Sequence, residues 1–389
     1  MWCRGLNAWA SLQPRPQLPR GVKFEEVTNT ATPETPPLGA HLSWPRRRHL
    51  VTWLWLGAAL TFSMLVVGGV TRLTQSGLSI VEWAPLVGVV PPLDEAQWQD
   101  AFAQYQRFPE YRQLRPDMTL AEYKTIFYWE YAHRLLARAI GVVFLLPFLF
   151  FWLRGYLKGP LARRLLLLFG LGALQGLMGW FMVASGLVDR PSVAHERLAA
   201  HLLLAFTIFA YCLWTANDLL PKPRQTERSP GLYGWLVTFG IILVLQVTYG
   251  AFVAGLDAGK AFNTYPLMAG SLWPPAAWRL EPPLLNLLDN IATVQWIHRT
   301  LPLLLLVVAV GLLVATLRHR AEPGGRLDVG WAAVLVSGVL IQGALGVATL
   351  LSFVPLGLAA IHQATALLLF GAWVLWLHRA TRLRLAVRP

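Results

Sequence analysis

Eight apolar segments, each long enough to cross a lipid bilayer as a helix, follow one another along this 389-residue chain. A spanning helix needs about 20 mostly apolar residues. Only 14% of the residues are charged, against about 25% in soluble domains. The sequence therefore predicts an all-α integral membrane protein and excludes an ordinary soluble enzyme, a disordered protein and a fibrous repeat. The eight predicted spans cover residues 50–70, 127–153, 162–186, 195–219, 231–255, 290–317, 330–352 and 356–378.

The basic residues predict how these spans are oriented. They gather before the first span, in the links after spans two, four and six, and at the C-terminus. An excess of Lys and Arg marks cytoplasmic loops, so we expect both termini to be cytoplasmic. This placement accounts for the net charge of +13 without nucleic acid. Residues 1–44, rich in Pro and Thr, are interpreted as a disordered cytoplasmic tail.

The external loop of residues 71–126 is long for a membrane connection, and its stretch from Asp94 to Tyr105 is amphipathic. Such a loop either caps a site at the outer surface or is a plain structural connection. The sequence leaves both alternatives open.

The chain also contains an internal repeat. Residues 174–179 read Leu-Gln-Gly-Leu-Met-Gly and residues 341–346 read Ile-Gln-Gly-Ala-Leu-Gly, at an offset of 167. His133-Arg134 and His298-Arg299 match at an offset of 165, and Gly68 matches Gly250 at an offset of 182. Four spans per unit is an even number, so both units enter the membrane from the same side. We therefore predict two parallel four-helix bundles, residues 45–220 and 221–389, which we call the N half and the C half.

Four of the nine histidines occupy repeat-equivalent places, two in each half, each within about two turns of the outer end of its predicted span. An ionisable side chain inside a membrane is costly and is a functional candidate. Two imidazoles on facing helices can hold a haem iron from both sides; the alternative is a structural role in hydrogen bonding between helices. The four are His133, His201, His298 and His362. His195 is interpreted as interfacial, and His41, His49, His319 and His378 as solvated.

The two halves differ next to the first histidine of each pair. Glu130 lies three residues before His133, on the same helix face, whereas the equivalent residue in the C half is Gln295. A carboxylate beside one haem could accept a proton, or it could simply pair with a neighbouring arginine. Arginines at the outer ends of the spans either bind haem propionates through a forked hydrogen-bond geometry or extend to the interface. These arginines are Arg72, Arg134 and Arg299.

Residues 68–80, which read Gly-Gly-Val-Thr-Arg-Leu-Thr-Gln-Ser-Gly-Leu-Ser-Ile, resemble a signature of the haem A synthase family, in the form shared by proteobacteria and mitochondria. The segments 130–134, 197–201, 251–259 and 263–268 are also similar, and so are His298-Arg299 and His362-Gln363. The resemblance runs in order over residues 50–380. Some relatives carry a cysteine pair in the first external loop. The two cysteines of this chain are Cys3 and Cys212, so the chain resembles the branch without that pair.

The resemblance implies an oxidoreductase that acts on a methyl group, converting the ring-D methyl of haem O to a formyl through successive hydroxylations to give haem A. It implies haem b as cofactor between His298 and His362, and substrate haem O near His133 and His201 with Glu130 in catalysis. It also implies that the protein lies in the bacterial inner membrane and serves terminal oxidase assembly. The partners it implies are haem O synthase and membrane lipid. A homo-oligomer stays open, and the competing hypothesis is a dihaem b-type cytochrome that transfers electrons.

Overall fold

The computed structural model describes residues 38–81, 88–186, 193–221 and 231–387. Most of the tail predicted over residues 1–44 lies outside the described residues. The compact unit of the chain runs from Pro37 to Pro389.

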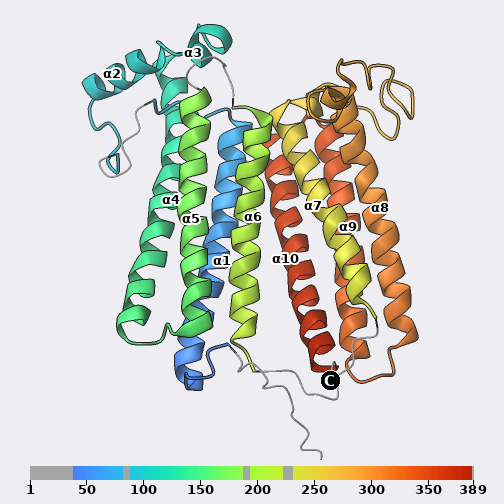
Figure 1. The fold of residues 1–389 in the computed structure, drawn as a ribbon. Coiled ribbons are helices and arrows are strands. Elements are labelled where there is room, and N and C mark those ends of the chain that lie inside the picture. The colour runs from blue at the N-terminus through green and yellow to red at the C-terminus, as the bar shows by residue number, and fades with distance from the viewer. Residues whose placement is uncertain (1–37, 82–87, 187–192, 222–230, 388–389) are drawn as a thin grey trace, which may run out of the picture. The chain divides into compact units, whose positions relative to one another are not determined.

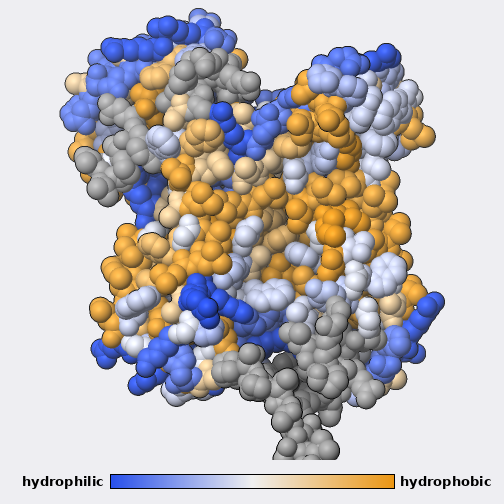
Figure 2. Space-filling model, in the orientation of Figure 1, coloured by the Kyte–Doolittle hydropathy of each residue, from blue (hydrophilic) through white to orange (hydrophobic). Residues whose placement is uncertain are grey.

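The described residues contain eight helices that are long and apolar enough to cross a membrane, which confirms the predicted number. Figure 2 shows an apolar band over their middle and hydrophilic residues at both ends, as expected where lipid surrounds the helices. The helices are α1 (Trp44–Leu73), α4 (Leu120–Leu153), α5 (Gly159–Gly186), α6 (His195–Asp218), α7 (Tyr233–Gly255), α8 (Ile291–Arg318), α9 (Gly325–Leu351) and α10 (Leu356–Val387).

The long helices form two groups of four (Figure 1). In the N half, α1 packs on α4 and α6, and α5 packs on α4 and α6. In the C half, α8 packs on α7 and α9, and α10 packs on α7 and α9. The groups meet where α1 and α6 contact α10 and where α6 contacts α7. Each group thus surrounds its own interior, as the repeat predicts.

The external loop of the N half folds into a small cap made of α2 (Glu95–Tyr105) and α3 (Pro109–Leu114). The Asp94 side chain accepts a hydrogen bond from the Gln97 backbone and so caps α2, which confirms the predicted amphipathic element. Aromatic side chains of α2 pack on the start of α4. The corresponding loop of the C half contains only two short 3₁₀ helices, η1 (Ala258–Lys260) and η2 (Pro283–Leu287).

Helix α4 begins seven residues before the span predicted from the apolar run. Thr119 and Glu122 form a reciprocal capping box at Leu120, a start signal that hydropathy does not detect. His133 consequently lies thirteen residues after the first residue of α4, and not within two turns of the helix end as we expected. The extra turns carry the residues on which the cap packs.

Polar contacts connect the two halves at both ends. At the cap end, Arg72 of α1 donates to the Ala254 carbonyl at 2.7 Å and lies 3.6 Å from Asp257. At the other end, His378 of α10 contacts Asp218 of α6 at 2.9 Å. The expectation that His378 is solvated is wrong, because its side chain is buried against this carboxylate and Trp214.

Candidate functional site

The predicted histidines lie in two pairs, one in each half. His133 of α4 and His201 of α6 are close enough to interact electrostatically, and so are His298 of α8 and His362 of α10. In each half the pair comes from the two helices that lie across the bundle, and the other two helices flank it. The structure therefore brings together the histidines that the sequence paired.

Each of these four imidazoles lies against a glycine of a flanking helix. A Cβ added to that glycine would come 3.0–3.4 Å from the ring, which is tight for a carbon contact. Glycine at these places therefore lets each imidazole pack directly against the backbone of the flanking helix. The pairs are His133 with Gly68, His201 with Gly179, His298 with Gly250, and His362 with Gly346.

Glutamines hold three of the four imidazoles. Gln175 contacts the Nε2 atom of His201 at 3.2 Å, and Gln342 contacts the Nε2 atom of His362 at 3.5 Å. Each glutamine also donates to the backbone carbonyl of the same histidine, at 3.2 Å and 2.7 Å. The Nδ1 atoms of His201 and His362 are buried and make no hydrogen bond within the described residues. Buried nitrogens without a partner are uncommon. Two imidazoles on opposite helices of a bundle, one of them with a free nitrogen, are a donor set that fits a haem iron.

Gln246 of α7 contacts the third imidazole, with 3.1 Å between its Nε2 and the His298 Nδ1. Its Oε1 is buried without a partner in the described part of the chain. Rotating the amide by half a turn would let this oxygen accept a hydrogen bond from the imidazole Nδ1–H. Such a second contact fixes the orientation of a metal-binding histidine. The offset of 182 that pairs Gly68 with Gly250 places Met64, a thioether, at the position equivalent to Gln246.

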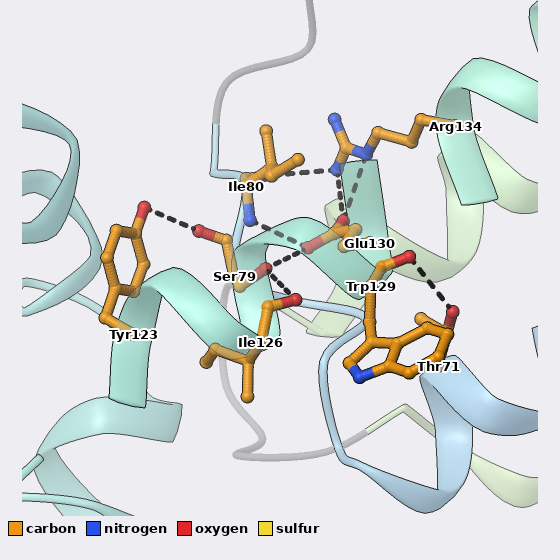
Figure 3. Close-up of polar contacts among 8 residues, drawn as sticks. All are labelled: Thr71, Ser79, Ile80, Tyr123, Ile126, Trp129, Glu130 and Arg134. Atoms are coloured by element: carbon orange, nitrogen blue, oxygen red, sulfur yellow. Dashed lines mark hydrogen bonds and ion pairs between the residues drawn. The ribbon is translucent and has the colours of Figure 1, made fainter. Parts of the chain in front are cut away.

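Glu130 is the buried carboxylate of the N half, with an exposed fraction of 2%. Its Oε2 accepts hydrogen bonds from the Ser79 hydroxyl at 2.7 Å and from the Ile80 backbone N–H at 2.8 Å. Its Oε1 accepts from Arg134 at 2.6 Å, and Arg134 also donates to the Ile80 carbonyl at 2.8 Å (Figure 3). The arginine pairing that the sequence left open as an alternative is therefore present.

The segment that delivers Ser79 to Glu130 is shaped by local contacts. Gln75 has a positive φ of 52°, which turns the chain back after α1. Arg115 of the cap holds this turn through the Gln75 side-chain oxygen at 3.2 Å and the Thr74 carbonyl at 3.1 Å. Tyr123 donates to the Ser79 carbonyl at 3.2 Å. Sequence reasoning missed Ser79, although the repeat offset pairs it with Ala261 and could have identified it.

The other predicted arginines bind backbone carbonyls at the cap end. Arg299 donates to the Thr264 carbonyl at 2.8 Å and to the Phe262 carbonyl at 2.5 Å. Arg72 spans the two halves, as described above. Their assignment to haem propionates stays a prediction, and the contacts show that each arginine also holds an external loop in place.

Glu110 of α3 is a second buried carboxyl in the N half that sequence reasoning missed. Its exposed fraction is 4%. Burial raises the pKa of Glu110 from the usual 4.5 to about 7, Arg115 opposes this shift, and Glu130 adds to it by repulsion. Burial also raises the pKa of the neighbouring Tyr105 hydroxyl. The cap therefore carries a group that titrates near neutral pH just outside the membrane-spanning part.

Known proteins are similar to this chain over most of its length. The family model described as "Cytochrome oxidase assembly protein" matches residues 51–374. A protein of Bradyrhizobium sp. (strain ORS 278) named "Heme A synthase" is 50% identical over 339 residues, which are 86% of this chain and 92% of that protein. A protein of Nitrosospira multiformis with the same name is 47% identical over 340 residues, 86% of this chain and 94% of that protein.

Proposed function

Because this chain belongs to the haem A synthase family, we propose that it oxidises the ring-D methyl of haem O to a formyl through successive hydroxylations. Its eight spans and its bacterial relatives make it a multi-pass protein of the bacterial inner membrane. The N half binds the substrate between His133 and His201, and the C half holds haem b between His298 and His362.

One observation carries this proposal: two matched histidine pairs, of which only one has a buried carboxylate beside it. Glu130 lies one helical turn before His133, and the equivalent Gln295 is a neutral amide. A carrier that only passes electrons needs no such difference. An enzyme that oxidises a substrate in one half needs a proton acceptor there and none in the other half.

The polar contacts of Glu130 support a catalytic role. Every contact described for its carboxylate comes from an O–H or N–H donor, so the side chain is held in one orientation. Oxidation of a C–H bond releases protons, and Glu130 is the group placed to take one up. Haem b, when bound in the C half, supplies one-electron redox chemistry.

The remaining assignments complete the proposal. We assign Arg72, Arg134 and Arg299 to the haem propionates. Haem O synthase supplies the substrate, and the product goes to terminal oxidase assembly. A second copy of the chain is a further candidate partner.

Expression with a haem O synthase in a host that lacks its own haem A tests this function. Haems extracted from the membranes are separated by reversed-phase chromatography, with the haem O synthase alone as the control. We expect haem A only when both proteins are present. A folded, haem-loaded protein that never yields haem A would reject the enzyme and favour the dihaem cytochrome.

A further inference from the structure

A group of metal-binding side chains lies outside the haem sites, at the cap end where the two halves meet. His195 and Glu196 begin α6 of the N half, and Asp289 precedes α8 of the C half. One ligand atom from each residue lies within 4.8 Å of the others. An acidic residue at the start of a helix would by itself suggest only helix capping. Here a histidine and a carboxylate from one segment meet a carboxylate from another.

His195 is held rigidly in this group. Its side chain, interpreted from the sequence as interfacial, is only 7% exposed. The Cβ of His195 packs closely on Gly255, where a side chain could not be accommodated. The centroids of the Phe252 ring and the imidazole lie 5.4 Å apart, and the two ring planes are at 88° to each other. Both the position and the plane of the ring are therefore fixed by packing.

The free nitrogen of His195 points into the group. Its Nε2 is buried and makes no hydrogen bond to any described residue, yet it lies 3.4 Å from Asp289 Oδ1. Two ligands of a tetrahedral zinc ion, each about 2.1 Å from the metal, lie about 3.4 Å apart. This separation is long for a hydrogen bond and matches two ligands that share one ion. Glu196 Oε2 lies 3.6 Å from the other ring nitrogen, Nδ1, so its exposed carboxylate has to turn toward the Nε2 side to share the ion.

We propose that His195, Glu196 and Asp289 form a site for a divalent first-row transition metal ion such as Zn²⁺. A neutral imidazole and two carboxylates carry a charge of −2, which a divalent ion balances. Nitrogen and carboxylate oxygen are both accepted zinc ligands. Arg72, which donates to the carbonyl of Gly255 beside His195, is balanced by Asp257.

The surroundings allow an ion to enter and give it a structural effect. Side chains of Glu196 and Asp289 are 49% and 41% exposed, so the open side of the site faces water and leaves a coordination position for it. Because His195 belongs to the N half and Asp289 to the C half, a bound ion joins the two halves. Binding to the folded state should therefore stabilise their association.

Zinc binding by the full-length, haem-loaded protein in detergent tests the site. Equilibrium dialysis against ⁶⁵Zn²⁺ compares the wild type with His195→Gln and Asp289→Asn. The matched control is His319→Gln, because His319 pairs with Glu322 at 2.7 Å without a third ligand in the described residues. We expect the wild type and the control to bind one zinc ion more than the two site variants, and zinc to raise the thermal midpoint only in the first two.

Equal zinc binding by all four proteins would overturn the proposal and leave a plain histidine–carboxylate ion pair. Loss of zinc in the control as well would also overturn it, because it would show binding to any surface histidine. The haem absorption spectrum reports folding of each variant. If His195→Gln does not fold, Asp289→Asn decides, since its half-exposed side chain changes only by one amide group.

Discussion

The polar clusters beside the two histidine pairs share one scaffold and differ in two side chains. Arg134 donates to the Ile80 carbonyl in the N half, and Arg299 donates to the Phe262 carbonyl, its repeat equivalent, in the C half. The N half then places Glu130 and Ser79 where the C half has Gln295 and Ala261. The arginine–backbone contact is thus common to both halves, and the acid and the hydroxyl distinguish the N half.

The exchanged side chains change what the cluster can do. Gln295 donates from its Nε2 to the Phe262 carbonyl at 3.3 Å, and its Oε1 is buried without a partner in the described residues. Glu130 instead accepts from the backbone N–H at the equivalent turn and from Ser79. The C half therefore has a neutral amide and a methyl group where the N half has a carboxylate and a hydroxyl.

Substitution of the histidines should give the largest difference in effect between the two halves. We expect His298→Ala or His362→Ala to abolish the resident haem, because each removes an iron ligand from the C half. His133→Ala and His201→Ala should keep that haem and lose product formation. Pyridine haemochrome spectra of the purified proteins and chromatography of extracted haems measure the two effects. An unchanged haem content in His298→Ala would contradict the assignment of the C half.

Glu130→Gln makes the N half resemble the C half. A positioned acid or base contributes roughly 10²–10⁴-fold to a rate, so we expect haem A formation to fall by at least about 100-fold while the resident haem is retained. Glu95→Gln is the control, since Glu95 is an exposed carboxylate of the same half that forms only a surface ion pair with Lys124. Activity above half of the wild type in Glu130→Gln would assign Glu130 a structural role.

The sequence predicted the helices and the histidine pairs because both depend on patterns that local spacing preserves. Apolar length identified the eight spans, and the repeat identified the partners of His133 and His298. The cap contacts were not predictable in this way. Arg115 reaches Gln75 across 40 residues of chain, and Glu110 is buried by side chains of other elements, neither of which leaves a periodic signal.

The errors have the same origin. His378 was expected to be solvated from its place near a helix end, but Asp218, 160 residues earlier in the chain, covers it. His195 was interpreted as interfacial and does begin a spanning helix, but its burial by Gly255 and Phe252 was not foreseen. Burial of a polar side chain at a helix end depends on which distant segment packs there, and hydropathy carries no information on that.

The cap of the N half and the corresponding loop of the C half should differ in how their stability depends on pH. Glu110 has a pKa of about 7 in the folded cap, above its usual 4.5, so the folded state binds this proton more tightly than the unfolded state. Stability of the cap is therefore greatest below about pH 4.5, falls as the pH rises toward 7, and changes by at most about 3 kcal/mol in total. The C-half loop uses neutral Asn286 and Asn290 as its buried polar groups and should lack this dependence.

Hydrogen exchange of the α2 and α3 amides at pH 5 and pH 8, corrected for intrinsic rates, measures the effect. Glu110→Gln should give equal protection at both values, and Glu95→Gln should behave as the wild type. A full pH dependence that persists in Glu110→Gln would assign the effect to another group.

The smallest expected difference concerns Gln246, which contacts His298, and Met64, its repeat equivalent in the N half. An amide that accepts from the Nδ1 proton orients the imidazole and strengthens it as a ligand, whereas a thioether is a weak acceptor. A cofactor must stay and a substrate must leave, so the stronger support belongs in the C half. We expect Gln246→Met to speed transfer of the resident haem to an acceptor protein about 10-fold and to shift its midpoint potential. Met64→Gln should leave both unchanged and slow release of product from the N half. If Gln246→Met changes neither the transfer rate nor the potential, the amide only fills space, and the difference in haem retention must come from elsewhere in the two bundles.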